Sequence, residues 1–170
     1  MRAWIRASAV LLVALALAMV IPTKRLLGEE RRMDSQMLAE VSQQLAMEDR
    51  FKNLRVEVED GTVRLRGTVA VLEDRRQAVQ KAHSVNDVKL VVVSHIKIET
   101  ERIGDGMLLK RLQERLAEDH NNHIRLKVKK GVVTIRGIVR HDTHREQVLS
   151  SVASMPGVIG MEDRLQVVVN

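Results

Sequence analysis

The sequence predicts an α+β protein made of two tandem copies of one small αββαβ unit behind an N-terminal apolar segment. Residues 55–99 repeat as residues 125–169 at a constant spacing of 70. In each copy, stretches of helical periodicity alternate with stretches in which apolar and charged residues alternate, as in half-buried strands. Two copies are too few for a solenoid, so we expect two small domains, residues 34–100 and 101–170.

Each copy is expected to begin with an amphipathic helix, because apolar residues recur every three or four positions there. Ser35 and Asp105 stand close to the start of these stretches and are of types that favour the N-cap, so we expect them to cap the helices. The two apolar stripes comprise Met37, Leu38, Val41 and Leu45 in the first copy and Leu108, Leu109, Leu112 and Leu116 in the second.

A β-hairpin follows each helix. Asp60-Gly61 is a strong signal for a two-residue turn, and Lys130-Gly131 is a weaker signal at the same place in the second copy. A two-residue turn fixes the register of the strands, which places Glu57 directly opposite Arg64. We therefore expect these two side chains to form a cross-strand ion pair.

A second helix and a closing strand complete each copy. Thr143, with Glu146 three residues later, predicts a capping box at the start of this helix in the second copy. The closing strands are predicted in VKLVVVSHIKI and RLQVVV. The buried stripes of the second helices comprise Ala78, Val79 and Ala82 in the first copy and Val148, Leu149 and Val152 in the second.

This order of elements, with the pattern G-x-V-x-[LI]-x-G-x-V in each hairpin, resembles the BON domain (bacterial OsmY and nodulation). The resemblance covers residues 34–170 and implies two BON-like domains of a bacterial envelope protein. Asp87 stands where the family pattern has glycine, so the turn before the first closing strand is expected to differ. The matching hairpin residues are Gly61, Val63, Leu65, Gly67 and Val69, and then Gly131, Val133, Ile135, Gly137 and Val139.

The first 33 residues read as a leader. Arg2 and Arg6 precede an apolar run over residues 7–21, which has the length of a signal-peptide core, and residues 16–18 (ALA) match a cleavage pattern. An uncleaved membrane anchor is the alternative, because Trp4 and Ile5 lengthen the run. Either reading places the body of the protein beyond the cytoplasmic membrane, in a periplasm.

The composition excludes several classes of function. The chain has no cysteine, so a disulfide scaffold, a thiolate metal site and a cysteine nucleophile are ruled out. Its two aromatic residues are too few for the base-stacking platforms of single-strand nucleic-acid binders, and we expect no nucleic-acid partner. No catalytic motif stands out, so a non-enzymatic protein without a cofactor is predicted.

Positive charge is concentrated in the second copy. Residues 34–103 hold eleven Lys and Arg against twelve Asp and Glu, whereas residues 104–170 hold eleven against eight. Where the first hairpin has Glu57, Glu59 and Asp60, the second has three lysines. We predict an anion-binding face on the second hairpin. A merely solvated face, or a face docked on acidic residues of the first copy, are the alternatives. The candidate residues are Arg125, Lys127, Lys129, Lys130, Arg136 and Arg140.

Four histidines fall in the second copy, two before the first strand of the hairpin and two after its second strand. Antiparallel strands bring these ends to one edge of the sheet, and imidazole nitrogens suit Zn or Cu. Polar loop histidines without a metal are the simpler interpretation, and we predict no metal site. The four residues are His120, His123, His141 and His144.

The resemblance and the basic hairpin together predict a protein that binds the anionic phospholipid surface of the envelope and supports envelope integrity or stress tolerance. The alternative is a periplasmic chaperone or adaptor for envelope proteins, as the osmotically induced relatives suggest. The sequence leaves the oligomeric state open.

Overall fold

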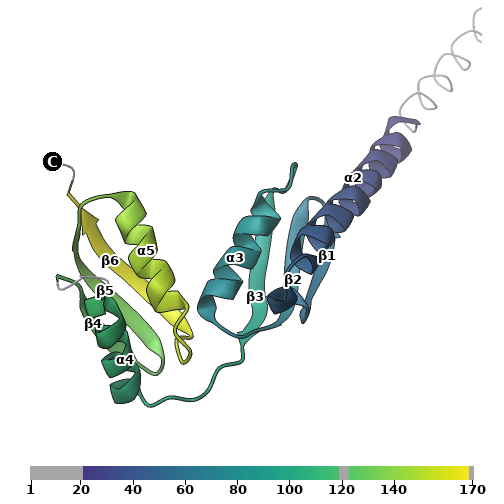
Figure 1. Ribbon diagram of the computed structural model, residues 1–170. Coiled ribbons are helices and arrows are strands. Elements are labelled where there is room, and N and C mark those ends of the chain that lie inside the picture. The colour runs from purple at the N-terminus through teal and green to yellow at the C-terminus, as the bar shows by residue number, and fades with distance from the viewer. Residues whose placement is uncertain (1–20, 119–122, 169–170) are drawn as a thin grey trace, which may run out of the picture.

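The computed structural model describes residues 21–118 and 123–168, which form two αββαβ units (Figure 1), and the predicted fold class is confirmed. The first unit comprises α2 (Ile21–Ala46), the 3₁₀ turn η1 (Asp49–Phe51), β1 (Leu54–Glu59), β2 (Thr62–Val69), α3 (Leu72–His83) and β3 (Leu90–Ile98). The second comprises α4 (Asp105–Glu118), β4 (Arg125–Lys129), β5 (Val132–Val139), α5 (Asp142–Ala153) and β6 (Gly160–Val167). The apolar run of the leader, up to residue 20, lies outside the described residues.

Each unit contains a three-stranded sheet with the second strand of the hairpin in the middle. That strand is antiparallel to the first and parallel to the closing strand, in the orders β1-β2-β3 and β4-β5-β6. The predicted hairpin registers are confirmed, with Glu59 opposite Thr62 in one unit and Lys129 opposite Val132 in the other. The sheets differ in one detail, because β3 carries a register shift against β2 and β6 pairs with β5 without one.

The two hairpin turns have the same backbone geometry. Asp60 and Lys130 have φ values of 51° and 52°, and the glycine after each has a φ of 74°. Positive φ at both central residues is the type I′ turn, whose twist matches that of the flanking strands. The weaker Lys130-Gly131 signal therefore produces the same hairpin as Asp60-Gly61.

Each turn is held by an aspartate from the first helix of its unit. The two carboxylate oxygens of Asp34 accept the backbone N–H groups of Asp60 and Gly61 at 2.9 and 3.0 Å. Asp105 does the same for Lys130 and Gly131 at 2.7 and 3.0 Å. In each unit, two charge-assisted hydrogen bonds thus hold the first helix against the hairpin turn.

The expected helix caps were wrong. Ser35 lies inside α2, which already begins at Ile21, and Asp105 is the first residue of α4 but directs its carboxylate to the hairpin turn. The capping box was also wrong. The residue before α5 is His141, it makes no capping hydrogen bond through its side chain, and Glu146 instead bonds Arg76 of the other unit.

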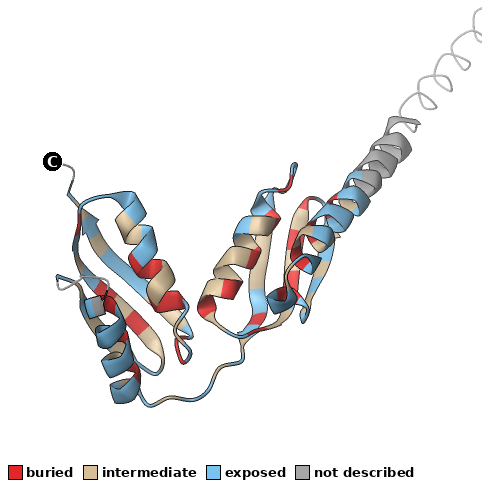
Figure 2. Ribbon diagram, viewed as in Figure 1, coloured by how far each residue is buried: buried red, intermediate tan, exposed pale blue. Residues whose placement is uncertain are grey.

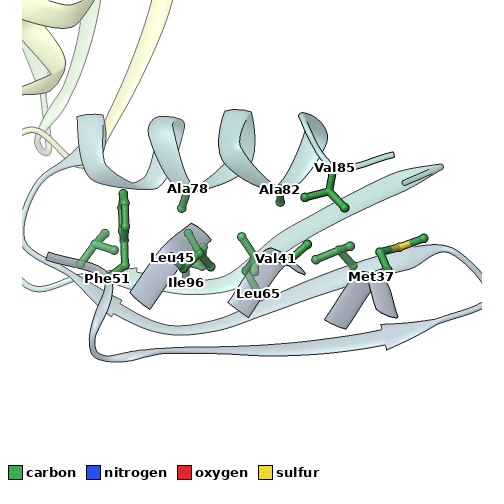
Figure 3. Packing of buried hydrophobic residues seen from close by; sticks show 11 residues of the cluster. Met37, Val41, Leu45, Phe51, Leu65, Ala78, Ala82, Val85 and Ile96 are labelled. Carbon is green, nitrogen blue, oxygen red and sulfur yellow. The ribbon is translucent and has the colours of Figure 1, made fainter. Parts of the chain in front are cut away.

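Both helices of a unit pack on the same face of its sheet, and the core lies between them (Figures 2 and 3). In the first unit α2 contributes Met37, Val41 and Leu45, and α3 contributes Ala78 and Ala82, all buried as predicted. Val79 is only half buried, unlike its predicted place in the core. The remaining members of this core are Phe51, Val63, Leu65, Val69, Val85 and Ile96.

The core of the second unit repeats this pattern, with Leu108, Leu112 and Leu116 of α4 all buried. The glycine at the middle of each hairpin motif has a steric role. Gly137 has a φ of 153° and a Cβ there would lie 2.6 Å from the carbonyl oxygen of His123, so only glycine fits. Besides the three leucines of α4, the core of the second unit contains Leu72, Val133, Ile135, Val148, Leu149, Val152, Ala153 and Val158.

The two units touch. Leu72 at the start of α3 packs into the core of the second unit, and Ile98 at the end of β3 lies against both cores. Arg76 of α3 also forms an ion pair with Glu146 of α5 at 2.9 Å. The hydroxyl of Thr100, in the connection between the units, accepts the N–H of Gly157 at 2.6 Å.

Candidate anion-binding face

The sheet surface opposite the helices is bare in each unit, since both helices cover the other side (Figure 2). Residues whose side chains alternate away from the core therefore point outward from the strands. In the second unit the six predicted cations gather there and at its two ends. We call this surface the basic face. It comprises Arg125, Lys127 and Lys129 of β4, Lys130 of the turn, Arg136 of β5 and Arg140 just after β5.

Two open hollows lie along the basic face and contain all six cations. The larger, of about 660 Å³, extends from the turn to the middle of the sheet and includes Lys127, Lys129 and Lys130. The smaller, of about 580 Å³, lies at the other end and includes Arg140. Arg125 and Arg136, which are directly opposite each other in the register, line both hollows. The structure thus brings the predicted residues together on one continuous surface.

None of these six cations forms an ion pair with a carboxylate within residues 33–117 and 123–168. The larger hollow contains one carboxylate, Glu162 of β6, which accepts hydrogen bonds from Thr134 at 3.3 Å and Arg164 at 3.2 Å. The alternative in which the basic face docks on acidic residues of the first unit is not seen among these residues. The face therefore presents a local positive field to solvent.

Sequence reasoning missed Arg164. It lies opposite Arg136 in the parallel pairing of β5 with β6 and lines the larger hollow. The register of a parallel strand is not fixed by a short turn, so its outward residues could not be assigned from the hairpin alone. The alternation of RLQVVV around Leu165 is the signal that would have indicated it.

An exposed apolar side chain lies within the basic face. Ile138 of β5 is 58% exposed and lines the smaller hollow beside Arg125, Arg136 and Arg140. The equivalent position in the first unit is Thr68. A branched aliphatic side chain surrounded by arginines suits a surface whose ligand combines negative charge with apolar groups.

The same face of the first unit is neutralised. Arg64 pairs with Glu59 at 2.7 Å, and Arg66 pairs with Glu57 at 3.4 Å. The predicted ion pair between Glu57 and the directly opposite Arg64 was wrong in its partners. The pairs form along the diagonal, which long side chains can span.

The histidines do not form a metal site in the part of the chain that the structure describes. No group of three or more His, Asp or Glu there is arranged to hold a metal ion. His123 lines the smaller hollow of the basic face, and His141 precedes α5. His120 lies outside the described residues, so the expected approach of the four histidines stays a prediction.

The first unit has an ionic network at the edge where the second unit has histidines. Arg50 and Asp74, which correspond to His120 and His144, are paired at 3.4 Å. Arg50 also pairs with Glu48, which accepts a second ion pair from Lys81 at 2.7 Å. The hydrogen bond from Lys81 and, to a smaller extent, the hydrogen bond from Arg50 lower the pKa of Glu48 below its usual value. This edge is therefore held by ionic contacts within the first unit.

The structural comparisons show only a coarse likeness to known structures. Two structures of CdsD, a structural protein of the type III secretion system of Chlamydia trachomatis, are similar to this chain. One, the C-terminal domain, has 15% identity over 79% of this chain and 67% of that chain, with a TM-score of 0.35. The other has 9% identity over 79% of this chain and 93% of that chain, with a TM-score of 0.38. A search of curated proteins found no match.

The family comparison is decisive. The BON domain family model matches the chain twice, over residues 34–100 and 104–169. BON domains are non-catalytic binding domains associated with membranes and phospholipids, and their proteins are typical of the bacterial envelope. The two matches cover both αββαβ units, so the chain belongs to the BON domain family and carries two BON domains.

Proposed function

We propose that this chain is a non-enzymatic bacterial envelope protein that binds anionic phospholipid surfaces through the basic face of its second BON domain. The observation that carries the proposal is the set of six cations on one bare sheet surface, none paired with a carboxylate in the described residues. In this proposal the cations contact lipid phosphates and Ile138 contacts the apolar part of the headgroup region.

The charge on this face is large enough to hold a protein on a membrane. Each cation near an anionic membrane surface contributes about 1 kcal/mol. Six such residues supply several kcal/mol, which is comparable with the roughly 5.5 kcal/mol that a single myristoyl chain contributes to reversible membrane binding. Because these cations are exposed, added salt weakens the attraction steeply.

The proposal places the protein in the periplasm, either free after signal cleavage or held by the leader. Within residues 21–118 and 123–168, no helix has both the length and the apolar character of a membrane span. Support of envelope integrity under stress would follow from membrane binding, and a role as an adaptor for envelope proteins is the second candidate. Adaptor binding through apolar contacts would resist salt, whereas binding through the basic face would not.

The test is co-sedimentation of residues 34–170, which contain both domains without the apolar leader, with anionic and with purely zwitterionic phospholipid vesicles over a salt series. We expect binding to the anionic vesicles alone, decreasing as salt rises. The triple variant Lys127→Glu/Lys129→Glu/Lys130→Asp gives the second hairpin the acidic residues of the first. Loss of about 1 kcal/mol for each cation predicts binding weaker by roughly a hundredfold.

A control variant makes the same number of charge reversals on the helix side of the second domain. Lys110→Glu/Arg111→Glu/Arg115→Glu changes three exposed residues of α4, away from the basic face. This variant should bind anionic vesicles more tightly than the hairpin variant. Equal losses in the two variants would contradict the assignment to the basic face, and salt-resistant binding to both vesicle types would contradict the lipid proposal itself.

A further inference from the structure

Both BON domains have a hollow at the turn end of the hairpin, formed by equivalent residues. In the first domain it has a volume of about 290 Å³ and includes Asp34, Asp60 and Asp87. In the second domain the equivalent positions, Asp105, Lys130 and Gly157, line a hollow of about 380 Å³. We call these the first and second turn hollows.

The second turn hollow is bordered by Ile98 at the end of β3 and by residues 100–104 of the connection between the domains. The Thr100 hydroxyl accepts the N–H of Gly157 at 2.6 Å. The side chain of Ile103 lies directly over Gly157, where its Cδ1 would be 3.3 Å from an added Cβ. A segment with a hydroxyl and a branched aliphatic residue thus forms one side of this hollow and packs against Gly157.

Among residues 21–118 and 123–168, the first turn hollow has no such segment, because α2 runs without a break from Ile21 past Asp34. Met33, at the place of Gly104, is 46% exposed and lines the hollow. Asp87 has the left-handed backbone of Gly157, with a φ of 64°. Among the described residues its N–H has no hydrogen-bond partner corresponding to the Thr100 hydroxyl.

The two hollows also differ in charge. The first has three aspartates and one cation, Lys89, at its rim. Two of those aspartates are replaced by Lys130 and Gly157 in the second hollow, whose own segment, IETERI over residues 98–103, contains two glutamates and one arginine. With three aspartates against one lysine, the first hollow carries negative charge, which a positively charged segment would complement.

We infer that the first turn hollow binds an extended, positively charged peptide segment of a partner protein. The segment has a hydroxyl residue that accepts the Asp87 N–H and a branched aliphatic residue that packs against Met33 and Met37. The flexible, polarizable side chain of methionine adapts to such a residue. Lysine or arginine side chains of the segment meet the carboxylates of Asp60 and Asp87. This site lies on the other domain from the basic face and is independent of the proposed lipid binding.

The experiment measures binding of labelled synthetic peptides to the full-length protein by fluorescence anisotropy at low salt. The peptide Ile-Lys-Thr-Lys-Arg-Ile is the segment of residues 98–103 with its glutamates replaced by lysine. The unaltered peptide Ile-Glu-Thr-Glu-Arg-Ile is its charge control, and Ile-Lys-Val-Lys-Arg-Ile lacks the hydroxyl. We expect the first peptide to bind more tightly than either of the others.

A pair of variants locates the site. Asp60→Asn/Asp87→Asn removes two charges, and asparagine tolerates the positive φ of both positions. We expect about five- to tenfold weaker binding of the basic peptide, because two partly exposed attractions are lost. The control Glu40→Gln/Asp49→Asn removes two exposed carboxylates elsewhere in the same domain and should bind as the unaltered protein does.

Equal binding of the basic and acidic peptides would overturn the inference, as would equal affinities of the two paired variants or no binding at all. The lipid-binding variant Lys127→Glu/Lys129→Glu/Lys130→Asp should bind the peptide normally. Loss of peptide binding in that variant would move the peptide to the basic face and would also overturn the inference.

Discussion

The outward faces of the two sheets have the same backbone geometry but differ in charge. In the first domain Glu57 and Glu59 neutralise two arginines on the face. In the second domain the same register carries Lys127 and Lys129, and the six cations of the basic face form no ion pair with a carboxylate within residues 33–117 and 123–168. The hairpins nevertheless have the same turn and the same strand pairing.

Charge on the bare face can change without cost to the core, because the side chains on that face point away from it. Both domains have two arginines directly opposite each other, Arg55 and Arg66 in the first and Arg125 and Arg136 in the second. In the first domain Glu57 pairs with Arg66, whereas in the second no carboxylate within residues 33–117 and 123–168 offsets the repulsion, so its hairpin bears a local cost. A bound anion would relieve that repulsion. The first domain keeps its face neutral and has its acidic hollow at the turn instead.

The largest effect is expected from moving the basic face to the first domain. In a chain whose second hairpin already carries the three acidic substitutions, we would add Glu57→Lys/Glu59→Lys/Asp60→Lys. These changes add three cations and also free Arg64 and Arg66 from their partners. Vesicle binding should recover by roughly a hundredfold in the co-sedimentation assay, at about 1 kcal/mol for each added cation.

A chain with the added lysines that remains unable to bind vesicles would show that charge on this face is insufficient. The contribution of Ile138 would then be decisive, because its counterpart Thr68 offers no apolar side chain. Adding Thr68→Ile to the same chain separates the two explanations by the same measurement.

The fold could be predicted from the sequence because its signals are periodic and occur twice. The hairpin register was predicted correctly because a two-residue turn fixes every pair along the strands. The positions of Lys127, Lys129 and Arg136 on one face follow directly from that register. Their grouping into a candidate site was therefore within reach of sequence reasoning.

Two of the errors came from contacts between elements distant in the sequence. Asp105 was recognised as a residue that accepts backbone hydrogen bonds, but its partners are in a turn 25 residues away and not in its own helix. Glu146 was assigned to a capping box and instead meets Arg76 of the other domain. Local patterns identify the chemistry of such side chains and leave their tertiary partners undetermined.

Removal of the aspartate that holds each hairpin turn should destabilise the two domains unequally. Asp105→Ala removes two hydrogen bonds to the Lys130-Gly131 turn and should destabilise the second domain by about 2 kcal/mol. Asp34→Ala removes the same two bonds from Asp60-Gly61 and should cost about half as much, since that dipeptide favours the type I′ turn by itself. Amide hydrogen exchange in β1–β2 and in β4–β5 measures the two domains separately.

Equal losses of protection in the two domains would show that the turn dipeptides contribute no difference. Asp105→Asn serves as the control, because its single side-chain oxygen can still accept one of the two N–H groups. Its effect should lie between those of the unaltered protein and the alanine variant.

The smallest effect on stability is expected at the contact between the domains, where two equivalent residues have opposite charges. Arg76 and Glu146 occupy equivalent positions of α3 and α5, and their side chains meet at 2.9 Å. At this position the second domain has an acidic residue where the first has a basic one, and the opposite charges attract across the interface. A double-mutant cycle of Arg76→Ala and Glu146→Ala should give a coupling of about 0.5 kcal/mol, since both groups are partly exposed. The measurement is urea unfolding at low salt, and the coupling should shrink as salt is added. Arg76 also pairs with Glu73 at 3.1 Å, so the coupling and not the single losses measures the contact between the domains. A coupling of zero would assign that contact to the packing of Leu72 and Ile98 and to the hydrogen bond from Gly157 to Thr100.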